Sequence, residues 1–423
     1  MARKIESLRG MEDILPGEIE KWQFLEERAR FFFESRGFKE IRTPVLEYTD
    51  LFSRSVGEAS DIVHKEMFSF EDRGGRNITL RPEMTASVAR AVIEKGLLTQ
   101  AKFWNLYYWG PMFRAERPQA GRKRQFHQIG IEMINQSGPA CDLEAITLLY
   151  DFLNGMGLQD LRIRLNDLGT AENQERTAKK LREFFSKVSG KLCNDCQWRL
   201  EKNVLRVFDC KTESCQKMIE QAPWEEISPL SDDFKTLEQA LRERAVPYEV
   251  NRRLVRGLDY YNGTVFEIAH KALGAQDAVA GGGRYDRLYK ELGGPDVPAT
   301  GFSLGIERLL AVLEKGQTDF FNPLQNRRIY LANLESSREA VQFFEKTSLV
   351  LREHGFRIEM QPGETSLTRH LKKANQWKVR FVLILGSEEL KNGQWTVKDM
   401  TSGEQVLLKQ EAISNYLKGK LTL

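Results

Sequence analysis

Apolar and polar residues alternate along the chain with two different periodicities, one typical of helices and one typical of strands. Residues 17–36 place Trp22 and Phe33 at helical spacing, so we expect an amphipathic helix that ends at Gly37. Residues 38–46 alternate and contain a proline, which suits a strand at an edge or an interface. Further strands are predicted over residues 102–108, 125–134, 161–166, 264–269 and 299–304. Because these strands do not alternate regularly with helices, we predict an α+β fold around a largely antiparallel sheet.

The predicted secondary structure changes in the middle of the chain and again near its end. Residues 169–247 are helix-rich and charged and hold four of the five cysteines, and strand-like patterns resume at Tyr248. We therefore predict a discontinuous domain, residues 1–168 and 248–322, interrupted by a helical insertion. A separate α/β domain is predicted over residues 327–423. Its expected strands are residues 329–332, 357–360 and 381–385, and its expected helices are residues 338–353 and 367–377.

Composition and charge narrow the class of protein. The 423 residues contain 29% charged and 41% hydrophobic side chains, and no apolar run approaches the ~18 residues of a membrane-spanning helix. The polar start lacks the apolar core of a secretory signal, so we expect a cytoplasmic protein with no membrane partner. Residues 327–423 carry 16 Lys and Arg against 11 Asp and Glu, a net of +5, whereas the rest of the chain has a net of −2. This excess fits either a polyanion partner or an ordinary solvated surface.

Several familiar motifs are absent from the sequence. It contains no G-x-x-x-x-G-K-[ST], G-x-G-x-x-G or H-E-x-x-H run. A nucleotide site would therefore depend on arginine side chains and a metal ion.

Three arginine-containing segments are candidates for such a site. Residues 108–132 predict two strands joined by a hairpin with five basic residues between positions 114 and 124, although a solvated basic hairpin is the alternative. Arg308 lies in the first turn of a predicted helix, where a cation is unfavourable unless a ligand is present. Residues 256–261 contain two tyrosines, and the glycine triplet at 281–283 indicates a close approach of the backbone.

Together these segments resemble the class II aminoacyl-tRNA synthetases, and within them the histidyl-tRNA synthetase family. The resemblance covers nearly the whole chain and rests on the motifs Arg9–Pro16, Thr79–Thr85, the Arg114 hairpin, Arg256–Tyr261, Gly282–Asp286 and Gly305–Arg308. It implies an antiparallel catalytic sheet, a helical insertion, a C-terminal α/β anticodon-binding domain and a homodimer built partly through residues 38–46. It also implies that L-histidine is activated by ATP to histidyl-adenylate and transferred to the 3′ end of tRNA(His), releasing AMP and pyrophosphate.

The resemblance also implies roles for individual residues. Arg114 and Arg256 would be catalytic, because they would stabilise the negative charge that develops at the α-phosphate of ATP. ATP, together with Mg²⁺, would be bound by Arg114, Glu116, Arg117, Phe126 and Arg308, with adenine between the Phe126 ring and Arg308. Histidine would be bound by Glu83, Thr85, Gln128, Glu132, Tyr260 and Tyr261. The acceptor end of the tRNA would meet Gln119, Arg122 and Arg124.

The chemistry of histidine fits this assignment. A neutral imidazole has one donor and one acceptor nitrogen, and Glu132 and Tyr261 would form hydrogen bonds with these two nitrogens. Glu83, Thr85 and Gln128 would hold the α-ammonium group.

Four cysteines have a spacing close to that of structural zinc sites, C-x₂-C-x₁₃-C-x₄-C. They are Cys193, Cys196, Cys210 and Cys215. The resemblance argues the other way, because related synthetases often carry some of these cysteines without a recognised zinc site. Zinc is therefore an alternative that the sequence does not favour, and no protein ligand is assigned to a metal.

Two other functions use the same fold. A non-catalytic, synthetase-like regulatory subunit of ATP phosphoribosyltransferase would usually lack the tRNA-binding tail and have degraded catalytic elements. A polymerase accessory subunit would likewise bind without catalysis. The presence of Arg114, Arg256, Arg308 and a basic tail favours the synthetase over both.

Overall fold

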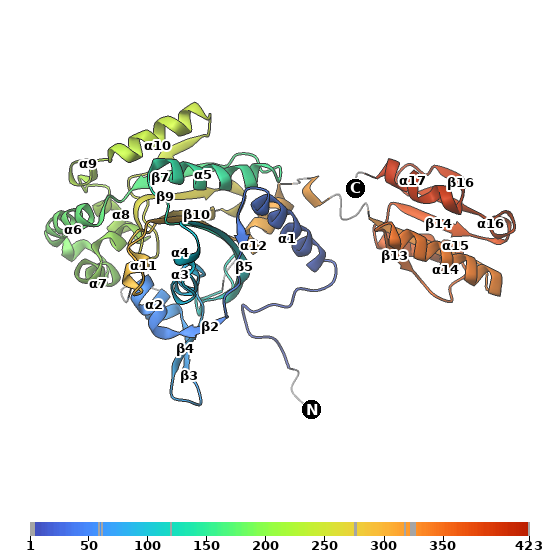
Figure 1. The fold of residues 1–423 in the computed structure, drawn as a ribbon, viewed down its shortest axis with the longest axis horizontal. Coiled ribbons are helices and arrows are strands. Elements are labelled where there is room, and N and C mark those ends of the chain that lie inside the picture. Colours follow the sequence, from blue (N-terminus) through green and yellow to red (C-terminus); the bar gives the residue numbers. More distant parts are fainter. Residues whose placement is uncertain are drawn as a thin grey trace. The chain divides into compact units, whose positions relative to one another are not determined.

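The computed structural model describes residues 5–57, 60, 62–118, 121–274, 277–316, 319–321 and 327–421. The chain divides into two compact units, each of which is shown in Figure 1. The larger unit contains residues up to Ile14 and Glu26–Thr318, and the smaller unit contains Leu15–Leu25 and Asp319–Leu423.

The larger unit is built on an eight-stranded sheet with the order β1-β5-β6-β11-β10-β9-β7-β8. In that order the strands are Lys39–Glu40, Trp104–Phe113, Gln125–Ile134, Ala299–Gly305, Ala278–Arg284, Asn262–Ala269, Arg162–Asp167 and Tyr248–Val250. Only the outermost pairs, β1 with β5 and β7 with β8, are parallel. The largely antiparallel sheet and the α+β class predicted from the sequence are therefore confirmed.

The strand predicted over residues 38–46 was wrong in extent. The two residues of β1 pair at the edge of the large sheet, and β2 (Leu46–Tyr48) belongs to a separate three-stranded sheet. That sheet has the order β2-β4-β3, with β4 at Asn77–Leu80 and β3 at Phe68–Glu71. Pro44 lies between β1 and β2, which is consistent with a break in strand pairing at this residue.

One face of the large sheet is an apolar core covered by α1 (Ile19–Glu34) and α5 (Pro139–Asn154). The Phe33 ring is the centre of this packing. Its centroid lies 5.6 Å from that of Tyr107, 5.1 Å from that of Phe152 and 6.4 Å from that of Phe302. This face is largely apolar, although it also holds a buried ion pair between Asp142 of α5 and Arg284 of β10 over 2.6 Å.

The other face carries the polar side chains. Successive residues of a strand point to opposite faces, and directly paired residues share a face. Glu132 pairs with Gly301, and Gln128 pairs with Gly305. These positions therefore share the face on which Met84 and α3 (Thr85–Glu94) pack against β5 and β6 (Figure 1).

Short helices complete the larger unit. They are α2 (Thr49–Val56), the π-helix η1 (Ile62–Glu66), α4 (Leu97–Gln100), η4 (Lys271–Leu273), α11 (Leu288–Glu291) and α12 (Ile306–Lys315).

Residues 169–247 are helical, as the sequence indicates. The helices are α6 (Ala171–Ser186), η2 (Ser189–Lys191), α7 (Asn194–Lys202), η3 (Val204–Asp209), α8 (Glu213–Ile219), α9 (Trp224–Ile227) and α10 (Asp232–Glu243). Phe185 and Phe208 share one hydrophobic core with Tyr261, so this segment packs as part of the larger unit. The predicted boundaries at 1–168, 169–247, 248–322 and 327–423 stay predictions.

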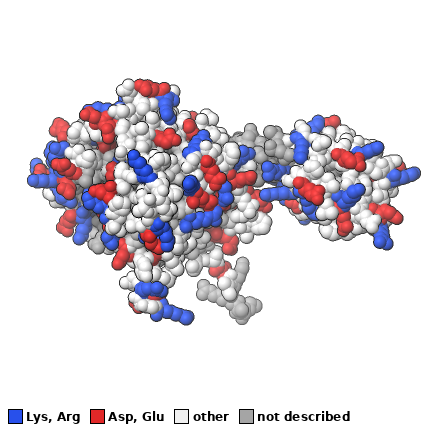
Figure 2. Space-filling view, viewed as in Figure 1, with Lys and Arg blue, Asp and Glu red and all other residues white. Residues whose placement is uncertain are grey.

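The smaller unit has a five-stranded sheet with the order β13-β12-β14-β15-β16. Its strands in that order are Arg357–Met360, Arg328–Asn333, Phe381–Leu385, Gln394–Asp399 and Gln405–Lys409, and its helices are η5 (Asp319–Phe321), α14 (Arg338–Glu353), α15 (Leu367–Gln376), α16 (Ser387–Asn392) and α17 (Gln410–Lys420). Trp395 is fully buried and donates from its indole N–H to the Thr347 hydroxyl over 3.0 Å. On the visible face, Lys and Arg are interspersed with Asp and Glu (Figure 2).

None of the helices in the described part of the chain is long and apolar enough to cross a membrane.

Candidate active site

Glu83 lies at the start of α3 and holds the helix N-terminus. Its two carboxylate oxygens accept hydrogen bonds from the backbone N–H groups of Thr85 (2.7 Å) and Ala86 (2.8 Å). Burial raises the pKa of this carboxyl, and the two backbone hydrogen bonds oppose that rise. The Tyr260 hydroxyl lies 3.4 Å from the same carboxylate. Glu83 is therefore an enclosed acid in a fixed orientation.

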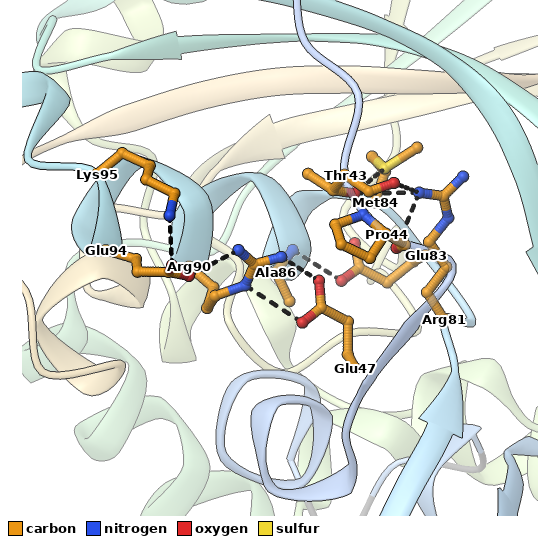
Figure 3. Close-up of polar contacts among 10 residues, drawn as sticks. All are labelled: Thr43, Pro44, Glu47, Arg81, Glu83, Met84, Ala86, Arg90, Glu94 and Lys95. Atoms are coloured by element: carbon orange, nitrogen blue, oxygen red, sulfur yellow. Dashed lines mark hydrogen bonds and ion pairs between the residues drawn. The ribbon is translucent and has the colours of Figure 1, made fainter.

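A polar network fixes α3 itself, as Figure 3 shows. Arg81 donates to the backbone oxygen of Thr43 (2.7 Å) and to that of Pro111 (3.0 Å). On the next turns of the helix, Arg90 forms an ion pair with Glu47. These contacts anchor both ends of the segment that carries Glu83.

Glu132 is the second enclosed acid, on β6. One oxygen accepts a hydrogen bond from the Tyr285 hydroxyl, whereas Oε1 is buried and has no hydrogen-bond partner among the described residues. Burial raises the pKa of Glu132 to about 8, with hydrogen bonding from Tyr285 opposing the rise and the charge of Glu83 adding to it. The paired residue on β11 is Gly301, where a Cβ atom would lie 2.5 Å from the Glu132 carboxylate. A glycine is thus required beside this acid.

Tyrosine rings surround the two acids. The Tyr260 centroid lies 4.7 Å from that of Tyr261 and 5.6 Å from that of Tyr285. We call Glu83, Glu132, Tyr260, Tyr261 and Tyr285 the carboxylate pocket. A pocket with two buried acids and several hydroxyls suits a small molecule that offers positive charge and N–H donors.

Gln128 and Thr85 extend this pocket. The Gln128 amide nitrogen lies 3.5 Å from the Ser303 hydroxyl, and its buried Oε1 has no partner among the described residues. The Thr85 side chain lies close enough to both acids to lower their pKa values by hydrogen bonding. Both residues therefore add acceptor or donor groups next to Glu83 and Glu132.

Arg256 lies before β9, and its guanidinium reaches the same face of the sheet. Nη1 lies 3.1 Å from the Glu267 carboxylate, and the buried Nε has no partner among the described residues. A Cβ atom at Gly281 would overlap this guanidinium, so the glycine-rich strand β10 makes room for it. The close approach predicted from the glycine triplet is confirmed. Tyr261 belongs to the carboxylate pocket and also lies close to Arg256. Burial raises the pKa of its hydroxyl, and the positive charge of Arg256 opposes that rise.

Arg114 follows β5 directly and contacts both the segment that carries Glu83 and the Phe126 ring. Its Nε donates to the backbone oxygen of Pro82 over 3.0 Å, next to Glu83. Its guanidinium lies 5.2 Å from the centre of the Phe126 ring. Burial lowers the pKa of Arg114, although a guanidinium stays protonated at neutral pH. A partly desolvated cation here favours an anionic ligand.

The hairpin between β5 and β6 adds further cations. Arg122 pairs with Glu116 over 3.1 Å, and Arg124 Nε donates to the Glu116 backbone oxygen over 3.3 Å. Arg308 approaches the backbone oxygen of Gly121 at 3.5 Å, and its pKa is lowered by burial and by the charge of Arg122. We call Arg114, Arg122, Arg256 and Arg308 the arginine cluster. Like charges close together are relieved when a polyanion binds.

The N-terminal motif lies against this hairpin. The Gly10 carbonyl accepts hydrogen bonds from the backbone N–H groups of Arg124 (2.8 Å) and Gln125 (3.1 Å), and Lys123 pairs with Glu12 over 2.7 Å. Gly10 has φ +83°, and a Cβ atom there would lie 2.8 Å from Pro118. The motif therefore fixes the base of the hairpin, a contact that the sequence did not predict.

The structure places most of the predicted site residues on one face of the larger sheet, with three qualifications. The Phe126 ring lies against Arg114 and Arg308 reaches Gly121, so an adenine site between Phe126 and Arg308 stays a prediction. Arg117 is exposed, and Gln119 lies outside the described residues.

Two residues of the site were missed by sequence reasoning. Tyr285 stands in the quoted Gly282–Asp286 motif, so a signal was available, but its hydrogen bond to Glu132 depends on the pairing of distant strands. Glu267 is an acid within a strand, and nothing in the sequence connects it with Arg256. Another such contact is between Glu307, in the first turn of α12, and the backbone N–H of His127 at 3.0 Å.

Known proteins resemble this chain over nearly its full length. Residues 10–309 match the family model described as histidyl-tRNA synthetase, and residues 328–420 match the anticodon binding domain. The chain is 43% identical over 415 residues to the histidine–tRNA ligase of Desulforamulus reducens, covering 97% of this chain and 98% of that relative.

Solved structures agree. The apo histidyl-tRNA synthetase of S. aureus has a TM-score of 0.75 and 31% sequence identity, covering 98% of this chain and 100% of that one. A Bacillus halodurans C protein described as an ATP phosphoribosyltransferase regulatory subunit/histidyl-tRNA synthetase shares the fold at 21% identity and a TM-score of 0.64, covering 91% of this chain and 99% of that one.

Proposed function

The chain belongs to the histidyl-tRNA synthetase family, and from this premise we propose how its site activates L-histidine with ATP and passes the histidyl group to tRNA(His). The observation that carries the proposal is the meeting of the carboxylate pocket and the arginine cluster on one face of the sheet. Arg114 bonds the carbonyl next to Glu83, and Arg256 lies close to Tyr261. The site therefore offers anions to the amino acid and cations to the triphosphate.

Histidine recognition falls to the carboxylate pocket. Tyr285 occupies one oxygen of Glu132 and leaves buried Oε1 to accept a hydrogen bond from an imidazole N–H. The Tyr261 hydroxyl would serve the other ring nitrogen. A pocket that pairs both nitrogens rejects side chains that leave a buried polar group unpaired. Glu83, Thr85 and Gln128 would receive the α-ammonium group, with Tyr260 holding Glu83 in place.

Activation joins the histidine carboxylate to the α-phosphorus of ATP. One carboxylate oxygen forms the new bond to phosphorus, and the bond to the pyrophosphate leaving group breaks. Negative charge on the phosphoryl oxygens is stabilised by Arg114 and Arg256, which are held in place beforehand by Pro82 and Glu267. The unpartnered Nε of Arg256 is a donor that such an oxygen would satisfy.

ATP would lie along the arginine cluster. Phe126 and Arg308 would enclose the adenine ring, Glu116 would accept from its exocyclic amine, and Arg117 would approach the outer phosphates. In the structure Glu116 pairs with Arg122, so ATP binding requires that pair to rearrange.

Mg²⁺ would accompany ATP and screen the charge of its phosphates. The acids near the arginine cluster already have partners, since Glu267 pairs with Arg256 and Glu116 pairs with Arg122. This donor set fits an ion that arrives on the nucleotide more than one held in a protein cage. We therefore assign it no protein ligand.

The remaining interactions concern the tRNA and the assembly. Arg122 and Arg124, with Gln119, would meet the acceptor end, and the smaller unit, whose residues 328–420 match the anticodon-binding family, would meet the anticodon arm. The homodimer built partly through residues 38–46 and the cytoplasmic location are further parts of the proposal.

ATP–pyrophosphate exchange tests this function most simply. Exchange should require histidine and should be absent with the other amino acids, and the purified protein should then charge tRNA(His). If no amino acid stimulates ATP–pyrophosphate exchange, activation is refuted and the regulatory alternative is favoured again. Exchange with histidine but no charging would contradict the roles of the hairpin and the smaller unit.

A further inference from the structure

The four insertion cysteines converge in space. Their Sγ atoms all lie within 4.8 Å of one another, and those of Cys193 and Cys210 are 3.8 Å apart. A tetrahedral zinc ion with Zn–S bonds of about 2.3 Å places its sulfur ligands about 3.8 Å from each other. We propose that the thiolates of Cys193, Cys196, Cys210 and Cys215 bind one structural zinc ion. The sequence did not favour this site.

The surroundings of the sulfurs match a closed structural site. Cys196 and Cys215 are completely buried and Cys210 is 6% exposed, so water has little access to a bound ion. The backbone N–H of Cys193 donates to the Cys215 sulfur over 3.2 Å, and that of Thr212 donates to the Cys210 sulfur over 3.4 Å. Such N–H groups orient thiolate ligands and offset part of their charge.

Ordinary core packing explains these contacts less well. A free cysteine in a core behaves as a small apolar residue and can face any neighbour. Here four thiols that belong to two separated pairs face one another. All five cysteines of the chain are free thiols in the structure, so disulfide pairing does not account for the convergence.

The ligands lie on short elements that gain from a cross-link. Cys193 caps the nine-residue helix α7 and Cys196 lies in its first turn, whereas Cys210 caps η3 and Cys215 belongs to the seven-residue helix α8. Isolated helices of this length are unstable in water. A metal ion that ties both pairs together would contribute its binding free energy to the folding of this region.

The segment between the two cysteine pairs supports the active site. Asn203 donates to the Asp259 carboxylate over 3.0 Å, and Arg206 donates to the backbone oxygen of Arg256 over 3.1 Å. The backbone that carries the catalytic guanidinium therefore rests on a segment whose two ends would be held by the metal. Zinc would act on catalysis through position, without touching the substrates.

Metal analysis gives the first test. Untagged protein is purified without chelators from zinc-containing medium, and its metal content is measured by mass spectrometry. We expect about one zinc per chain in the wild-type protein and in Cys141→Ser, and none in the Cys193→Ser/Cys196→Ser double variant. Less than about 0.1 zinc per chain, iron in place of zinc, or equal zinc in all three proteins would overturn the proposal.

A thiol titration on the wild-type protein avoids the risk that the double variant does not fold. Without chelator only Cys141 should react quickly, and the four insertion cysteines should react after the metal is removed. Co²⁺ added to the metal-free protein should give the visible absorption of a tetrahedral thiolate complex. Fast reaction of the insertion cysteines before chelation, or no such absorption, would contradict the site.

The positioning role has its own readout. Removal of the metal should increase amide hydrogen exchange in residues 192–219 and in the Arg256–Tyr261 segment. It should also lower the rate of histidine-dependent ATP–pyrophosphate exchange about 10–100-fold, and adding zinc should restore both properties. Faster hydrogen exchange confined to residues 192–219, with unchanged activity, would overturn the link to Arg256 and leave a purely local metal site.

Discussion

The carboxylate pocket and the arginine cluster adjoin each other, yet they are built in opposite ways. The pocket is enclosed, with Glu83 only 3% and Glu132 only 1% exposed, and its members hydrogen-bond to one another. The cluster lies largely on loops, and its arginines mostly bond backbone carbonyls or single acids. Burial raises the pKa values of the acids and lowers those of Arg114 and Arg308. Each region therefore gains most from a ligand of the opposite charge.

The difference separates recognition from chemistry. An enclosed pocket with fixed partners can discriminate the shape and donor pattern of a small molecule, which is a matter of binding. Cations at a more open position act on charge that grows during the reaction, which is a matter of rate. Variants of the two regions should accordingly fail in different kinetic constants.

The largest effect is expected from the cluster. Arg256→Ala removes a donor aimed at the reacting phosphate, and the maximal rate of histidine-dependent ATP–pyrophosphate exchange should fall by about 10²–10³-fold. Circular dichroism should show an unchanged fold. Arg256→Lys keeps the charge but not the planar fork, so it should recover only part of the rate. Near-normal exchange by Arg256→Ala would reject the assigned role.

The pocket gives the next effect. Glu132→Gln keeps one carbonyl oxygen but cannot become the carboxylate that would pair with the imidazole N–H, so the KM for histidine should rise about 10–100-fold while the maximal rate changes little. Glu144, an exposed acid of α5, provides the matched control, and Glu144→Gln should behave as the wild-type protein. A KM unchanged by Glu132→Gln would show that this acid does not contribute to the recognition of histidine.

A glycine variant tests the geometry of the cluster without removing any functional group. Gly281→Ala places a methyl group where the Arg256 guanidinium lies, so the maximal rate should fall about tenfold while histidine affinity is kept. Gly190→Ala is the control, because no atom lies within 4 Å of its added Cβ. A wild-type rate in Gly281→Ala would mean that Arg256 works from a different position.

The smallest effect concerns pH and the pocket. With a pKa of about 8 in the folded protein and an ordinary value near 4.5, Glu132 keeps its proton when the unfolded chain has lost it. The free energy of unfolding should therefore fall as pH rises through that window. Between pH 6 and 8.5 the unfolding temperature should drop about 2–4 °C more in the wild type than in Glu132→Gln. Equal slopes would contradict a buried, protonated Glu132.

Much of the fold was predictable from periodicity. The bounds of β6, β13 and β14 agree with the predicted ones, because apolar alternation or short buried runs mark them directly. Strand β10 was missed because its Gly281–Gly283 triplet has low strand propensity, and the same glycines give Arg256 its space. The sequence thus concealed a strand at the place where function required small residues.

The site was predictable only in part. The roles of Glu83, Glu132 and Arg256 came from resemblance to a family, since nothing in residue spacing brings these positions together. Their partners Tyr285 and Glu267 depend on the pairing of β6, β11, β10 and β9, which the sequence does not specify. The convergence of the four cysteines likewise depends on how α7, η3 and α8 pack.

The division of labour between the two regions is tested most directly by measuring binding and rate in the same variants. Histidine affinity is measured by titration calorimetry, and adenylate formation is measured in a single turnover at saturating histidine and ATP, for Glu132→Gln and Arg256→Ala. The account predicts weaker affinity with a retained rate in Glu132→Gln, and retained affinity with a lost rate in Arg256→Ala. If both variants lose affinity and rate to the same extent, recognition and chemistry are not separated in this site.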